Sequence, residues 1–142
     1  MQRAHVDISH DLDGDAVVHA VFDLAPEQIS AAAHAVRAVA GERFRMSEIS
    51  ADDVLELREL TALADELGEL SGGASTVVLR PARLSALRYA VAEFVQSRDE
   101  AEWTREEDRD ALPFLRELLL PLEQLSAEAT RSALASPHQQ AY

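Results

Sequence analysis

Three of the five histidines lie in the first twenty residues, among several aspartates, so this stretch contains the residue types of a metal site. If Asp13 and Gly14 form a two-residue hairpin turn, His10 lies opposite Val17. His10 and His19 then become diagonal neighbours on one face of a sheet, within reach of a shared metal ion. A one-residue shift of register would move one of them to the other face, which leaves ordinary sheet or surface histidines as the alternative.

A second candidate site lies in the one segment of the chain with a net positive charge. Residues 73–98 contain four arginines and one glutamate, between two strongly acidic segments. Arg80 and Arg83 lie where a helix is expected to begin, and a helix N-terminus favours negative charge. We therefore expect an anion-binding site formed by Arg80, Arg83 and Arg88. Surface ion pairs between these arginines and neighbouring carboxylates are the alternative.

The leucines near the C-terminus indicate self-association. Apolar side chains point in nearly every direction around the expected last helix, so this helix must be covered on more than one side. A chain of 142 residues offers few elements to surround it. A homodimer would bury the remaining leucines in a two-fold interface. The expected interface residues are Leu112, Leu115, Leu118, Leu119, Leu122 and Leu125.

Motifs typical of catalysis or of cofactor binding are missing from the sequence. There is no Gly-x-Ser-x-Gly elbow, no Gly-x-Gly-x-x-Gly fingerprint and no Walker loop. The run from Asp11 to Asp15 fails as a calcium loop, since the required glycine would fall on Ala16. Cysteine is absent, which excludes disulfides and thiolate ligands. We therefore expect no cofactor and have no sequence evidence for an enzyme.

The net charge of −13 disfavours binding to nucleic acid, because a phosphate backbone repels an acidic protein. A basic protein partner, or mimicry of DNA, would instead use an acidic helix face. That face comprises Asp52, Glu56, Glu59, Asp65, Glu66 and Glu69. All 13 basic residues are arginine, and lysine and asparagine are absent, which is typical of a GC-rich bacterial genome. With no signal peptide and no membrane span in the sequence, we expect a cytoplasmic protein.

The elements that must position these residues follow from the hydrophobic pattern. The Asp13–Gly14 signal predicts an N-terminal β-hairpin, and a β-branched run predicts a short third strand. Apolar residues at helical spacing predict about four helices, the last of them long and kinked by Pro113 and Pro121. The fold class is therefore α+β and predominantly helical, with one domain over 1–135 and a flexible tail over 136–142. The expected strands are 5–12, 16–24 and 76–79, and the expected helices are 26–40, 50–71, 81–97 and 105–133.

Taken together, these features favour a small, non-catalytic, homodimeric protein that acts through protein contacts, as a regulatory or accessory module. One alternative is a small-molecule-binding protein or small enzyme, with an anionic ligand held between Arg80, Arg83 and the histidines His10 and His19. Another is an acidic inhibitor that mimics DNA.

Overall fold

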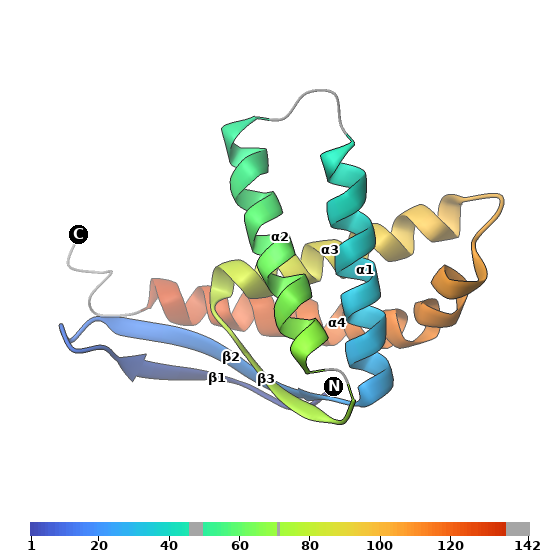
Figure 1. Cartoon of the computed structure of the whole chain (residues 1–142). Coiled ribbons are helices and arrows are strands. Elements are labelled where there is room, and N and C mark those ends of the chain that lie inside the picture. The colour runs from blue at the N-terminus through green and yellow to red at the C-terminus, as the bar shows by residue number, and fades with distance from the viewer. Residues whose placement is uncertain (46–49, 71, 136–142) are drawn as a thin grey trace.

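A β-hairpin, a helix pair, a third strand and two further helices follow one another along the chain (Figure 1). The computed structural model describes residues 1–45, 50–70 and 72–135. The predicted α+β class, the order of the elements and the N-terminal hairpin are confirmed. The elements are β1 (Gln2–His10), β2 (Ala16–Leu24), α1 (Pro26–Phe44), α2 (Ala51–Glu69), β3 (Ser75–Leu79), α3 (Pro81–Glu100) and α4 (Glu106–Leu134).

The hairpin turn is longer than the sequence predicts, and this changes the register of the strands. The N–H of Gly14 donates to the carbonyl of Asp11, and Gly14 has a φ of 82°. The Asp11 carboxylate accepts the N–H groups of both Asp13 and Asp15 at 2.9 Å. This is a three-residue loop closed by an aspartate side chain, rather than a two-residue turn. His10 consequently pairs with Ala16 and not with Val17.

The three strands form an antiparallel sheet in the order β1-β2-β3, and one face of the sheet is buried. Along β2, side chains alternate between buried and half-buried positions, as expected for a sheet packed on one side. The core-facing residues of this strand are Val18, Ala20, Phe22 and Leu24. The hairpin strand β1 is exposed at every residue but one, Val6.

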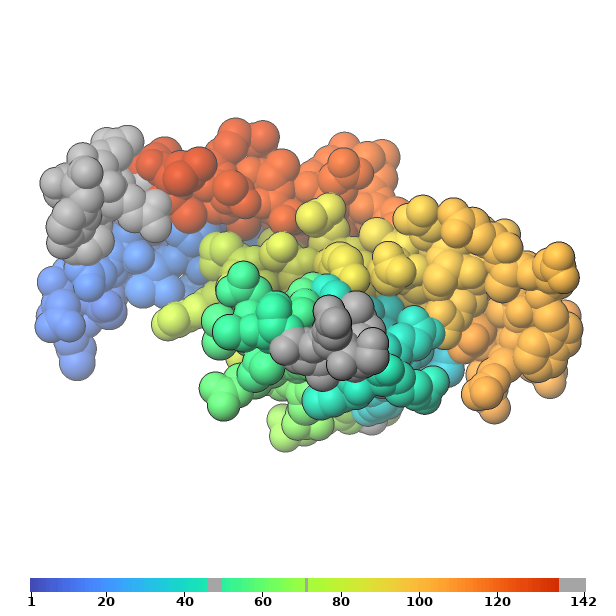
Figure 2. All heavy atoms as spheres, turned by 90° about the horizontal axis from the view of Figure 1, so that it is seen from above, coloured from blue at the N-terminus to red at the C-terminus, as the bar shows by residue number. Residues whose placement is uncertain are grey.

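The helices lie on the core side of the sheet in two layers (Figure 1). Helices α3 and α4 pack against the strands, while α1 and α2 form an antiparallel pair that packs on α3 and α4. Figure 2 looks down on this pair, with α4 along one side and the hairpin at one end. None of the helices in the described ranges is both long and apolar enough to cross a membrane.

The helix ends show which local signals were read correctly. Pro26 is the first residue of α1, as expected, and Ser50 and Asp53 form a capping box at the start of α2. Gly41 does not end α1, which continues to Phe44. Helix α4 begins after Arg105, and it runs without a break through its two internal prolines. The expected tail over 136–142 lies outside the described residues.

The prediction that the C-terminal leucines form a dimer interface is wrong for most of them. Five of the six are at most 6% exposed within a single chain, and Leu119 is partly buried. The sheet on one side and α1 and α3 on the others supply the cover that a second copy was expected to provide. Leu120 is the leucine of this run that stays exposed, at 61%. The buried leucines are Leu112, Leu115, Leu118, Leu122 and Leu125.

Candidate functional site

Four charged or titratable side chains from three helices form a connected network in the described part of the chain. The Nε2 atom of His34 on α1 lies 2.7 Å from Oδ1 of Asp108 on α4. The other carboxylate oxygen of Asp108 accepts a hydrogen bond of 3.2 Å from Nε of Arg98 on α3. Arg98 in turn pairs with Glu42 near the end of α1, at 2.8 Å. The network therefore links α1, α3 and α4 at one end of the molecule.

An aromatic ring supports two members of this network, His34 and Arg98. Phe94 is fully buried, and the ring of His34 meets it edge-on with a centroid distance of 5.6 Å. The guanidinium of Arg98 lies 4.3 Å from the centre of the same ring, within cation–π range. Arg98 also donates to the hydroxyl of Ser97 at 2.8 Å. These contacts restrict the rotamers of both side chains and so fix their orientation.

Asp108 is the most buried charged residue of the network, with a side chain 12% exposed. Burial alone would raise the pKa of this carboxyl, because it disfavours the charged form. Hydrogen bonds from His34 and Arg98 favour the carboxylate and outweigh that effect, so the pKa of Asp108 lies below its usual value. Asp108 is consequently ionised at neutral pH and can hold the charge of Arg98.

A groove of about 560 Å³ lies beside this network, between the first halves of α1 and α4. His34 lines it on one side. The floor is apolar, with Ala31, Ala111 and the partly buried ring of Phe114. The remaining lining residues, which include three carboxylates, are Pro26, Glu27, Ser30, Gly72, Glu107 and Asp110. We call this the α1–α4 groove.

The three carboxylates of the α1–α4 groove have no ion pair with any residue that the structure describes. Glu27, Glu107 and Asp110 are all exposed. Neither arginine nor lysine lines the groove. It therefore combines an apolar floor with uncompensated negative charge at its edge.

A smaller hollow of about 240 Å³ lies against Arg98 and Asp108, and Trp103 lines it. Trp103 is itself 75% exposed. Aromatic residues that remain this exposed are frequent anchors of protein interfaces. One carboxylate oxygen of Asp108 thus contacts His34, which lines the α1–α4 groove. The other contacts Arg98, which lines this hollow.

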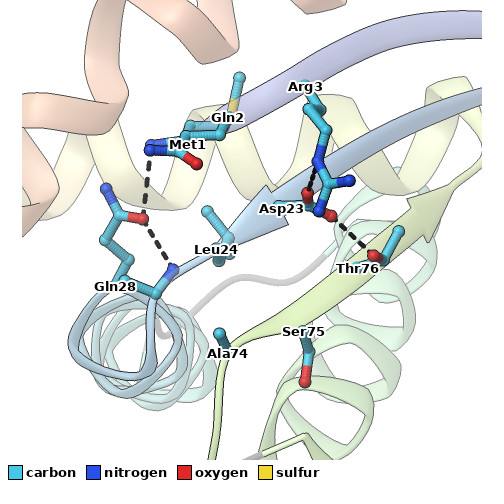
Figure 3. A pocket seen from close by; sticks show the side chains of 10 residues that line it. Met1, Gln2, Arg3, Asp23, Leu24, Gln28, Ala74, Ser75 and Thr76 are labelled. Carbon is cyan, nitrogen blue, oxygen red and sulfur yellow. Dashed lines mark hydrogen bonds and ion pairs between the residues drawn. The ribbon is translucent and has the colours of Figure 1, made fainter.

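A third hollow, of about 380 Å³, lies where β1 begins and β2 ends (Figure 3). Its polar groups are used within the chain. Asp23 accepts hydrogen bonds from Arg3 at 2.5 Å and from Thr76 at 2.6 Å, and both contacts lower the pKa of this carboxyl. The side-chain oxygen of Gln28 accepts from the N–H of Ala25, the N-cap residue of α1. We assign these contacts to the fold rather than to a ligand.

The predicted metal site at His10 and His19 is not formed, because the register differs by one residue from the expected one. His10 pairs with Ala16 on the core side of the hairpin, whereas His19 pairs with Asp7 on the open face. In the described residues, the clustered set of metal-type ligands is instead Asp11, Asp13 and Asp15 at the turn. Asp11 is already engaged there in closing the loop.

The three arginines of the predicted anion site have different environments. Arg83 is held between Glu59 at 3.1 Å and Glu66 at 3.2 Å, both on α2. Arg80 and Arg88 are exposed and have no ion pair in the described ranges. Arg83 therefore links α3 to α2 through ion pairs, which agrees with the alternative that these arginines pair with neighbouring carboxylates. An anion at this position would have to compete with two carboxylates of the chain itself.

The acidic face expected on α2 is partly neutralised by arginines of the same chain. Arg43 donates to Glu56 at 2.6 Å, and Arg83 holds Glu59 and Glu66. Half of the six carboxylates of that face are thus paired with arginines of the same chain. Asp52, Asp65 and Glu69 are exposed, without an ion pair among the described residues.

Sequence analysis missed the His34–Asp108–Arg98 network. Asp108 lies four and seven residues before Leu112 and Leu115, so continuing their buried stripe towards the start of α4 leads to this aspartate. A carboxylate on the buried face of a helix requires a partner, and this signal was present in the sequence. The partner could not be identified, because His34 is separated from Asp108 by 74 residues.

Comparison with known proteins gives no family for this chain. No family model, no curated protein and no solved structure matches it.

Proposed function

We propose that the protein is a non-catalytic interaction module that holds a basic segment of another protein in the α1–α4 groove. The observation that carries this proposal is the set of three exposed carboxylates, Glu27, Glu107 and Asp110, around an apolar floor. None of them has an ion pair within the described chain, so all three are available to a partner.

The shape of the groove suits one face of an amphipathic helix. Small alanine side chains where α1 and α4 meet leave a shallow hollow, here floored by Ala31 and Ala111. Phe114 adds an aromatic wall against which apolar side chains can pack. Lysine or arginine side chains at the edge of such a helix would then meet the three carboxylates. The net charge of −13 would also speed the approach of a basic partner.

We assign His34 a positioning role in this module rather than a catalytic one. Its partner Asp108 shares its charge with Arg98, which makes the carboxylate a poorer support for a general base. Ser30 lines the same groove, one turn before His34, but no hydrogen bond joins its hydroxyl to the imidazole. The imidazole instead fixes the distance between α1 and α4, and so the width of the groove.

The test measures binding of a fluorescent 18-residue peptide of leucine and lysine, arranged as an amphipathic helix, by anisotropy. The test variant reverses the three groove charges, as Glu27→Lys, Glu107→Lys and Asp110→Lys. A matched control reverses three unpaired carboxylates of α2, as Asp52→Lys, Asp65→Lys and Glu69→Lys. Both variants change the net charge equally, so long-range attraction is weakened by the same amount in each.

We expect the groove variant to lose binding by about a hundredfold and the α2 control by less than about tenfold, because only the groove charges would contact the peptide. Equal losses in both variants would show that net charge alone attracts the peptide, and would refute the proposed groove. Circular dichroism establishes that both variants remain folded.

A further inference from the structure

The first strand, β1, is an open edge of the sheet. It has nine residues, and β2 is its one neighbouring strand in the described part of the chain. The opposite edge, β3, has five residues and ends two residues before Pro81, which begins α3 and has no backbone N–H to donate. Of the two edges, β1 therefore has the longer row of backbone groups available for a further strand.

Between its bulge and the turn, β1 contains Asp7 as its one acidic residue and few other features that block edge pairing. Between the bulge near Arg3 and the turn it contains no proline, and its core-side residues Val6 and Ile8 are apolar. Ile8 pairs with the buried Val18, yet it remains 49% exposed. An apolar side chain on the core side of a sheet is thus left half uncovered at the edge.

A second copy of β1 could pair with the first only in a few registers. An antiparallel pair about a two-fold axis perpendicular to the sheet keeps the helices of both copies on the same side. Two residues that lie opposite each other in an antiparallel pair have their side chains on the same face of the sheet. The two-fold axis must therefore pass through a residue and not between two neighbouring residues. Val6, Asp7 and Ile8 are the central positions that keep most of the strand paired.

Charge selects one of these three registers. With Asp7 on the axis, two carboxylates lie directly opposite each other, which is unfavourable. With Ile8 on the axis, His10 lies opposite Val6 and puts a polar ring against the apolar row. With Val6 on the axis, His5 lies opposite Asp7 of the second copy, and this contact occurs twice. Ile8 then lies opposite Ala4 of the second copy and becomes covered.

We infer that two copies of this chain associate through β1, antiparallel, with Val6 on the two-fold axis, to form a continuous six-stranded sheet. Backbone hydrogen bonds supply the affinity, as in other cases of strand addition. The two contacts between His5 and Asp7 set the register. This interface differs from the predicted leucine interface, and no residue of β1 lines the α1–α4 groove.

The test is sedimentation equilibrium of the full chain with a charge exchange. The native protein is expected to sediment at about twice its mass of 15.6 kDa. His5→Asp places an aspartate opposite Asp7 of the other copy on each side of the two-fold axis. Because this repulsion occurs twice, the variant should weaken the dimer about tenfold or more. Combining His5→Asp with Asp7→Arg places opposite charges across each contact and should recover the dimer.

His19→Asp is the matched control, because it puts the same substitution beside Asp7 on the central strand, away from the edge. It should leave the dimer intact. Hydrogen exchange of the β1 amides should slow as the protein concentration rises. A native protein that is monomeric at about 100 µM would overturn the inference, as would a dimer that His5→Asp leaves unchanged. Charge reversal in the α1–α4 groove should not alter the dimer, so the two proposals fail separately.

Discussion

The imidazole of His34 and the carboxylate of Asp108 meet at 2.7 Å across the contact between α1 and α4. Asp108 is also the acceptor for Arg98, whose side chain is 16% exposed and lies over the ring of Phe94. The carboxylate thus compensates a guanidinium that is largely removed from water. Its loss would leave a mostly buried cation with Glu42 as its remaining carboxylate partner.

Replacing this carboxylate by an amide, as Asp108→Asn, should lower the free energy of unfolding by about 2 kcal/mol, the usual scale for hydrogen bonds to charged groups. Urea denaturation at pH 7 measures the change. The control is Asp99→Asn, which removes the partner of Arg116 in a pair that is about half exposed on both sides. That variant should lose about 0.5 kcal/mol or less. Equal losses would show that the network contributes no more than a surface pair.

The stability of the protein should fall in acid, in part because of Asp108. Hydrogen bonds from His34 and Arg98 lower the pKa of Asp108 in the folded state despite its burial. A carboxyl with a lowered pKa stabilises the fold fully above its unfolded pKa of about 3.9, and the contribution disappears as pH falls through the folded value. Urea midpoints measured from pH 7 to pH 2 should therefore drop below about pH 4. The drop should be smaller in Asp108→Asn, and an unchanged acid profile in that variant would contradict the assignment.

The elements of the fold were predictable because local signals agreed with the tertiary structure. Pro26 and Pro81 each begin a helix, and the Ser50–Asp53 pair caps another. The spacing of Leu57, Leu60 and Leu67 matches the buried face of α2. These signals act within a few residues, so they do not depend on distant parts of the chain.

The strand register could not be predicted, because two turns compete at the same dipeptide. Asp13 and Gly14 suit a two-residue turn, but Asp11 can also accept two backbone N–H groups and stabilise a three-residue loop. One residue of difference moves His10 and His19 to opposite faces. The candidate metal site failed for this reason alone.

The C-terminal leucines were wrongly predicted to form a dimer interface, because a sequence indicates the apolar faces of a helix but not the elements that cover them. Helix α4 is the long apolar helix that was predicted, and yet α1, α3 and the sheet suffice to bury most of it. The alanines of α1 allow this, since small side chains let neighbouring helices approach closely. The candidate groove likewise depends on contacts between distant segments, which no local pattern encodes.

A pair of leucine variants on α4 distinguishes core from surface. Leu118 is 1% exposed, so Leu118→Ala should create a cavity and lower the free energy of unfolding by about 3 kcal/mol. Leu120 is 61% exposed, so Leu120→Ala should change it by about 0.5 kcal/mol or less. Urea denaturation measures both. A small effect at Leu118 would mean that this leucine is not part of the core of one chain.

Trp103 provides a direct measurement of the exposed surface beside Asp108. It is the one tryptophan of the chain and is 75% exposed, so its emission in the folded protein should already resemble that of tryptophan in water. Acrylamide should quench it nearly as well before unfolding in urea as after; a neutral quencher is needed, because the net charge of −13 repels iodide. Trp103→Ala should change the free energy of unfolding by about 0.5 kcal/mol or less, since little packing is lost. A blue-shifted, poorly quenched emission would show instead that the ring is buried. Trp103 could then not serve as an anchor for a partner at the hollow beside Asp108.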